Sequence, residues 1–224
     1  MFSKKNNIIV LLLLITVTSI LPSLVLAQQA KSNTLRIRIG EPTTVEDTTP
    51  EGEKSGPISG VKDLVDKIIA SNDCTGSGSR GVVNSGNVST CVNSVNMSKI
   101  ASDEIRTSAS NYYNLQCVGF TKASVGEATN TSFRDYGVWN AKDYALIPPA
   151  GYKFHSKNST SPKIGDIGVW GGSGTGHVAF VIDIDSRAFV VAEANWGSPG
   201  GNVKNSRFVD KNDPNFLGWV RKNE

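Results

Sequence analysis

Apolar and polar residues divide the chain into three parts. An apolar run fills most of residues 8–27, polar residues dominate 28–59, and longer apolar stretches return mainly after residue 105. A chain of 224 residues has room for one ordinary domain with attachments, and its last part is the richest in residues that could build a core. We therefore expect the main folded domain at residues 105–224.

The first 27 residues have the pattern of a signal peptide. Two lysines precede the apolar run, and Val25-Leu26-Ala27 places small residues where a signal peptidase reads. An uncleaved anchor is the alternative, because a helix over residues 8–27 would span about 30 Å, but Pro22 favours cleavage. Either way we expect an exported protein, secreted or associated with the cell surface or cell wall, that meets the membrane only through this segment.

The next parts of the chain are a predicted linker and a predicted helical extension. Residues 28–59 are too polar to fold alone, although LRIRIG at 35–40 alternates like a strand. Apolar residues in VKDLVDKIIAS, residues 61–71, keep helical spacing, and a second helix is predicted from Met97 to Ser108. Residues 60–104 are therefore expected to form a helical extension.

The three cysteines pose a pairing question. Cys74 and Cys91 flank a loop rich in Gly, Ser and Asn, and an exported protein favours disulfides, so we expect these two to pair. If the cell surface lacks oxidation machinery, all three would instead be reduced. Under the first prediction Cys117 is the free thiol.

Cys117 stands where a polar segment gives way to a predicted helix. Asn114 and Gln116 come before it, and VGFTKASVGEA follows. At a helix N-terminus the dipole and the free N–H groups lower a thiol pKa and can hold an oxyanion. Cys117 is therefore a candidate nucleophile, with a buried structural thiol as the alternative.

Two later apolar runs predict a β-hairpin. Residues 177–184 and 188–195 are joined by a short polar turn at 185–187, and His177 begins the first run. A histidine at this place could be a hydrogen-bonded core residue. The second run changes that interpretation because it carries polar side chains of its own.

Glu193 and Asn195 lie two residues apart in the second run, so in a strand both side chains point to the same face. The hairpin can bring His177 close to these acceptors. A thiol nucleophile needs a base, and the base needs an acceptor on its other ring nitrogen. We therefore predict a catalytic set of Cys117, His177, Glu193 and Asn195.

Other chemistries have little support in the sequence. Basic residues exceed acidic ones by three, which does not favour a nucleic-acid partner. The glycines at 171–176 lack a phosphate-loop pattern, and the histidines and acids lack metal-ligand spacing, so no metal or cofactor is expected.

His155 is expected in a solvated loop. The tryptophans could line a glycan cleft, although core or rim packing is their more frequent fate: Trp139, Trp170, Trp196 and Trp219.

Four segments together resemble one family. They are LQCVGF at 115–120, PKIGDIGVWGG at 162–172, GHVAFV at 176–181 and EANWG at 193–197. In this order and spacing they are similar to the CHAP domain, the cysteine- and histidine-dependent amidohydrolase/peptidase domain of papain-like fold found in peptidoglycan hydrolases. The resemblance spans roughly residues 108–221.

The resemblance implies a fold and a set of residue roles. The fold is α+β, with N-terminal helices packed on an antiparallel sheet built from runs near 166–170, 177–184, 188–195, 206–209 and 216–221. By this resemblance Cys117 is the nucleophile, His177 is the general base, and Glu193 orients the histidine. Asn195 is a further polar member of the site, and Gln116 and Trp196 bind substrate. The family often has bulkier aromatic residues just after the cysteine, so Gly119 predicts a wider cleft.

The resemblance also implies an activity. We expect an exported peptidoglycan hydrolase that cuts an amide bond, either as an N-acetylmuramoyl-L-alanine amidase or as an endopeptidase of the stem or cross-link. Peptidoglycan is then the partner, and we expect a monomer. The alternative is a noncatalytic wall-binding or surface protein that uses the fold as a scaffold.

Overall fold

The computed structural model describes residues 57–224 except 77, 136–137, 173 and 185–187. The described residues all belong to one compact unit. The expected signal peptide, the alternating segment 35–40 and the predicted hairpin turn lie outside the described residues. So does the linker up to residue 56.

Along the described chain the helices precede the six strands of the larger sheet, and two short strands lie between the first and second helices. The helices are α1 (Pro57–Ala70), α2 (Val88–Ser94), α3 (Lys99–Tyr112), α4 (Cys117–Thr129) and a 3-10 helix η1 (Ala141–Ala145). The strands are β1 (Thr75–Gly76), β2 (Ser79–Arg80), β3 (Tyr152–Ser156), β4 (Ile167–Trp170), β5 (His177–Ile184), β6 (Ala188–Ala194), β7 (Val203–Asp210) and β8 (Phe216–Lys222).

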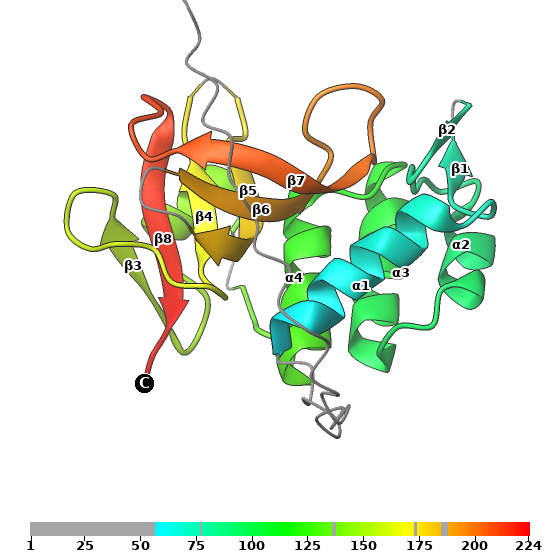
Figure 1. Ribbon diagram of the computed structural model, residues 1–224, viewed down its shortest axis with the longest axis horizontal. Helices are drawn as coiled ribbons and strands as arrows, with labels where there is room; N and C mark the ends of the chain where they lie inside the picture. The colour runs from blue at the N-terminus through cyan, green and yellow to red at the C-terminus, as the bar shows by residue number, and fades with distance from the viewer. Residues whose placement is uncertain (1–56, 77, 136–137, 173, 185–187) are drawn as a thin grey trace, which may run out of the picture. The chain divides into compact units, whose positions relative to one another are not determined.

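The larger sheet is antiparallel throughout, in the order β3-β8-β4-β5-β6-β7. Figure 1 shows the four α-helices gathered at one side of this sheet. The protein is therefore α+β, as expected, and the hairpin of β5 and β6 is present. The expected strands appear with small changes at their ends.

Both faces of the central strands are buried, which explains their nearly continuous apolar runs. Val178, Phe180 and Ile182 of β5 pack in the core shared with the helices, whereas Ala179 and Val181 pack on the other face. That second face contains mainly aromatic and β-branched side chains: Trp170, Phe189, Val191, Val209, Phe216 and Trp219. Successive side chains of β5 therefore alternate between the two faces of the sheet.

Helix α4 is the central helix of the fold. It contacts α1, α3, β5 and β6, and most of its residues are buried, because its sequence is small or apolar on nearly every side. At Gly119 a Cβ atom would overlap Ser108 of α3, and at Gly126 it would meet Ile100. The two glycines therefore let α3 approach α4 closely. This packing fixes the first turn of α4, where Cys117 lies.

The N-terminal helices share their core with α4. Val61 and Leu64 of α1 and Ile105 of α3 belong to the same cluster of buried residues. The boundary predicted between residues 104 and 105 falls inside α3, and α1 begins at Pro57 rather than after residue 59. Proline is favoured in the first turn of a helix, which accounts for the earlier start.

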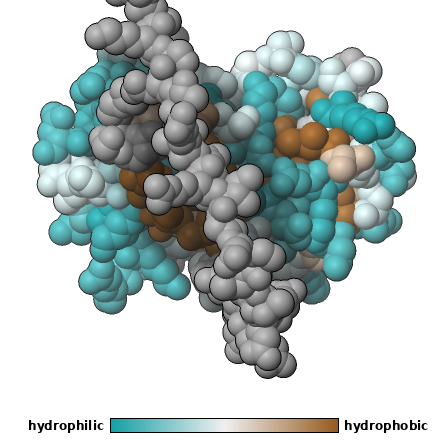
Figure 2. Space-filling view, viewed as in Figure 1, coloured by the Kyte–Doolittle hydropathy of each residue, from teal (hydrophilic) through white to brown (hydrophobic). Residues whose placement is uncertain are grey.

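In the view of Figure 2 the described surface is mostly hydrophilic, with smaller hydrophobic patches. Among residues 57–224, apart from the gaps named above, no helix combines the length and apolar character that crossing a bilayer requires.

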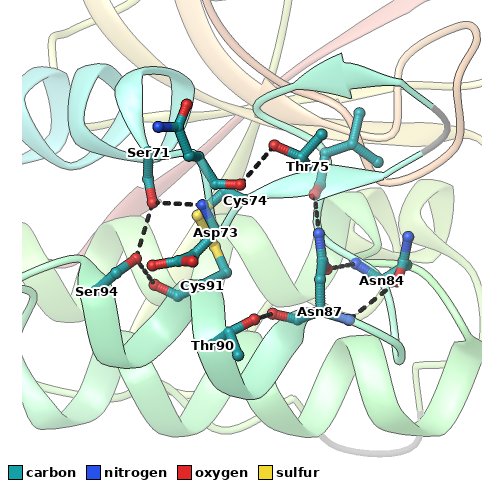
Figure 3. Close-up of a disulfide and its surroundings, with 11 residues drawn as sticks. Ser71, Asp73, Cys74, Thr75, Asn84, Asn87, Thr90, Cys91 and Ser94 are labelled. Carbon is teal, nitrogen blue, oxygen red and sulfur yellow. Dashed lines mark hydrogen bonds between the residues drawn. A yellow bond between two sulfur atoms is a disulfide. The ribbon is translucent and has the colours of Figure 1, made fainter.

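A disulfide joins Cys74, just after α1, to Cys91 of α2 (Figure 3). The two Cα atoms are 4.6 Å apart, and both side chains are fully buried. Ser71 and Ser94 share a hydrogen bond of 2.8 Å beside the bridge, which further connects the two segments. The structure thus pairs the cysteines that the sequence suggested and leaves Cys117 as the free thiol.

We expect the Cys74→Ala/Cys91→Ala variant to lose about 3 kcal/mol of unfolding free energy, because the bridge closes a loop of 17 residues in the unfolded chain. Urea denaturation of the variant and of the unreduced parent protein measures the difference. The pairing itself is tested by alkylating the unreduced protein and mapping the label. Label on Cys117 alone is expected, and label on either bridged cysteine would contradict the assignment.

Candidate active site

Cys117 is the first residue of α4, as predicted. Gln116 before it has extended backbone angles, φ −91° and ψ 158°, and the helix starts at the cysteine. The half-buried thiol therefore lies beside the free N–H groups of the first helical turn, where the dipole favours negative charge. This position suits a thiolate.

His177, the first residue of β5, lies between the thiol and a carboxylate. Its Nε2 atom is 2.8 Å from Oε2 of Glu193, and its ring also hydrogen-bonds the Cys117 thiol. Since Nε2 faces the carboxylate, Nδ1 is the nitrogen left for the sulfur. The three side chains form a chain of hydrogen bonds from helix α4 through β5 to β6.

Glu193 is fully buried on β6 and is held by a second partner, Arg207 of β7. Nε of Arg207 donates to Oε1 at 2.6 Å and an Nη2 N–H donates to Oε2 at 2.7 Å, which makes a bidentate pair. The guanidinium lies over two aromatic rings, 4.8 Å from the ring centroid of Trp170 and 4.4 Å from that of Trp196. These contacts fix the carboxylate that faces the histidine.

The electrostatics favour charge separation between cysteine and histidine. Burial raises the pKa of the Cys117 thiol. The hydrogen bond and charge of His177, together with backbone N–H groups, lower this pKa by more than burial raises it. Those N–H groups belong to Val178 and Val118. The net pKa of the thiol lies below its ordinary value.

The histidine shifts in the opposite direction. Burial lowers the pKa of His177, but its hydrogen bonds and charge interactions with Cys117 and Glu193 raise it above the ordinary value. Burial also raises the pKa of Glu193, yet His177 and Arg207 outweigh it, so this pKa is lowered. The arrangement favours a thiolate, an imidazolium and an ionised carboxylate side by side.

Asn195 contacts the residue before the nucleophile. It follows β6 in a left-handed conformation, φ 60°, which asparagine tolerates better than most residues. Its Nδ2 donates to Oε1 of Gln116 at 2.9 Å, and its Oδ1 accepts from the Gly201 amide at 2.9 Å. These bonds place Asn195 beside Gln116 rather than on the imidazole nitrogens, which already face Cys117 and Glu193.

Two hollows flank the cysteine and histidine pair. The larger, about 320 Å³, lies beside Cys117 and Gln116, with walls from α3, α4 and the segment that leads into η1. The smaller, about 280 Å³, is lined by His177, Trp196 and glycines after β4. The ring centroid of Trp196 is 4.6 Å from that of His177. Gln116 and Trp196, expected to bind substrate, thus lie on opposite sides of the pair.

Two residues differ from the sequence interpretation. Arg207 was not among the predicted site residues, although a buried carboxylate such as Glu193 requires a positive partner, and Arg207 stands in the predicted strand at 206–209. His155 was expected in a loop but lies in strand β3, opposite Trp219 of β8. The expectation was wrong because Tyr152 and Phe154 alternate inward around it.

The described residues contain no cluster of side chains suited to a metal ion. Over residues 57–224, outside the gaps in the description, no group of three or more His, Cys, Asp or Glu side chains is arranged to hold an ion. The charged residues of the site pair with one another instead.

Comparison with solved structures gives distant matches, and no curated protein matches the sequence. A wild type endolysin, LysIME-EF1, is 22% identical with a TM-score of 0.37, covering 62% of this chain and 64% of its own. Ly7917 is 12% identical with a TM-score of 0.44, covering 74% of this chain and 62% of its own. Its structure with the hydrolyzing product of MDP is 14% identical with a TM-score of 0.40 and the same coverage. This chain spans less than two thirds of the length of each.

The family comparison is specific to the segment that holds the site. The model of the CHAP domain matches residues 107–195. These limits include Cys117, His177 and Glu193, whereas Arg207 lies beyond them. Residues 107–195 of this chain are therefore a CHAP domain.

Proposed function

We propose that this protein is an exported peptidoglycan hydrolase that cleaves an amide bond of the cell wall by a thiol mechanism. The observation that carries the proposal is the chain of contacts from the Cys117 thiol at the start of α4 through His177 to Glu193. The CHAP match over the same residues supports it. The matching segment also supports secretion or association with the cell wall as the location, and peptidoglycan as the partner.

In the first half of the reaction the thiolate of Cys117 attacks the amide carbonyl. The thiol proton resides on Nδ1 of His177, and N–H groups at the start of α4 are available to the oxyanion. When the tetrahedral intermediate collapses, the C–N bond breaks and the imidazolium gives its proton to the leaving amine. A thioester between the acyl group and Cys117 remains.

Water then completes the cycle. His177, now neutral, takes a proton from a water molecule, whose oxygen attacks the thioester carbonyl. The C–S bond breaks, the acid product leaves, and the thiol and imidazole return to their starting state. Glu193 holds the imidazole by Nε2 throughout and stabilises its positive charge, while Asn195 positions Gln116 beside the nucleophile.

The reaction is tested on purified peptidoglycan. The mature protein is expected to release fragments with new amino and carboxyl ends, identified by mass spectrometry, and heat-denatured protein serves as the control. Retention of the protein on the wall without any new ends would favour the alternative, a noncatalytic wall-binding or surface protein.

We further expect Cys117 to react with iodoacetamide at a pH below the ordinary range of a thiol, about 8.5. Since His177 lowers the thiol pKa, the pH at which alkylation is half-maximal should rise in His177→Ala, where only the backbone N–H groups still oppose the effect of burial. Rates of alkylation measured from about pH 4 to about pH 10 give the midpoint for the parent protein and for the variant. Equal midpoints in the two proteins would show that the thiol and imidazole do not interact.

A further inference from the structure

The larger hollow beside Cys117 contains side chains that the hydrolytic mechanism does not use. Trp139 and Tyr112 line it, and they are 92% and 64% exposed. By contrast, Trp170 and Trp219 are each 1% exposed. A tryptophan left so fully in water next to a nucleophile has no packing role in the fold, and exposed aromatic surface of this kind marks binding sites.

We propose that this hollow binds a saccharide on the acyl side of the scissile bond, so that the amide cleaved is the one between N-acetylmuramic acid and L-alanine. The inference rests on the proposed function and selects one of its two reactions. We call the hollow the saccharide cleft, defined by Tyr112, Trp139, Asn111, Asn140, Glu104 and Asp135.

The positions of cysteine and histidine distinguish the acyl side from the amine side. The imidazolium of His177 must protonate the leaving nitrogen, so the amine part of the substrate lies on the histidine side. The smaller hollow is lined by His177 and Trp196, whereas the saccharide cleft is lined by Cys117 and not by the histidine. The acyl part of the substrate, which becomes bonded to the sulfur, therefore occupies the saccharide cleft.

The aromatic residues suit a sugar ring. A pyranose presents C–H groups on its faces and hydroxyl groups around its edge, so it packs on the face of an aromatic ring while its edge hydrogen-bonds polar groups. Tyr112 is the last residue of α3 and Trp139 lies just before η1, and both contribute to the same cleft. They provide surfaces for such packing.

The polar wall also suits a neutral ligand. Glu104 and Asp135 are largely offset by Lys122, whose Nζ is 3.4 Å and 3.3 Å from their carboxylates. Asp135 also accepts a hydrogen bond of 3.0 Å from Tyr144. The amides of Asn111 and Asn140 add donors and acceptors to the lining. Such a wall matches hydroxyl and acetamido groups better than it matches a strongly charged peptide end.

The first experiment measures binding without turnover. In Cys117→Ala protein, calorimetry is performed with the soluble disaccharide of N-acetylglucosamine and N-acetylmuramic acid, and separately with a stem peptide that has no sugar. Adding Trp139→Ala should weaken disaccharide binding at least tenfold and leave stem-peptide binding unchanged. Phe208→Ala is the matched control, since Phe208 is 71% exposed on β7 and is absent from the lining.

The second experiment identifies the bond. The wild-type protein acting on soluble muropeptides should release free L-alanine amino ends and intact sugars, and Trp139→Ala should raise KM about tenfold with little change in kcat. Equal disaccharide affinity in the Trp139 and Phe208 variants, or new ends inside the stem peptide, would overturn the inference but not the proposed function. Disaccharide binding that depends on Trp139, with no wall bond cut, would support the saccharide cleft and refute the proposed function.

Discussion

We expect Cys117→Ala to abolish peptidoglycan hydrolysis while the protein keeps its fold. Removal of the nucleophile from a cysteine, histidine and carboxylate set costs on the order of 10³ to 10⁶ in turnover, because no other group in the set can form the acyl intermediate. The half-buried Cys117 side chain is small, so its loss leaves little cavity. Release of wall fragments, followed by mass spectrometry, measures the activity, and urea denaturation measures the stability.

Cys117→Ser is the matched variant, because it keeps the volume and the hydrogen-bonding position of the side chain. It is expected to be inactive as well, since a serine hydroxyl does not ionise beside His177 as the thiol does. His177→Ala should be comparably inactive. Full lytic activity in the alanine variant at position 117, with normal expression and folding, would exclude the cysteine mechanism.

The core of the site could be predicted because its members follow simple local rules. Cys117 precedes a helix, and alternation in β5 and β6 puts His177 and Glu193 on the same face of the sheet. Neighbouring antiparallel strands then bring the two side chains within 2.8 Å. Strand alternation and element order were sufficient for these three residues.

Arg207 could not be placed by the same rules. Its position relative to Glu193 depends on the pairing of β6 with β7, and that register shifts between Val191 and Glu193. A shift of this kind is a bulge, which short sequence patterns do not reveal. The sequence alone does not distinguish Lys204 from Arg207 as the partner of Glu193, whereas the fold pairs the carboxylate with Arg207.

The packing of the N-terminal helices was also beyond the sequence pattern. Helical spacing predicted an amphipathic helix at residues 61–71, but it could not say which surface that helix covers. In the structure α1 packs on α4 and β7, and Asp66 accepts a hydrogen bond of 2.6 Å from Asn205. Contacts between residues so far apart in the chain depend on the tertiary fold, not on local periodicity.

The buried ion pair of Glu193 and Arg207 leads to the second large expected effect. Arg207→Met should lower the free energy of unfolding by about 3 to 5 kcal/mol, since it leaves a buried carboxylate without its bidentate partner. It should also lower kcat more than it changes KM, because Glu193 is then free to rotate or to take up a proton, and His177 loses its fixed orientation. Urea denaturation and rates on soluble wall fragments measure the two effects separately.

Two further variants show whether the charge or the geometry of Arg207 matters. Arg207→Lys keeps the charge but loses the bidentate contact, so intermediate stability and activity are expected. The double variant Arg207→Met/Glu193→Gln removes both charges and should recover a large part of the lost stability without recovering activity, which makes the two substitutions non-additive. Additive losses of stability in the double variant would mean that the carboxylate does not depend on Arg207. Activity equal to that of the parent protein in Arg207→Met would show that the guanidinium does not position the catalytic histidine through Glu193.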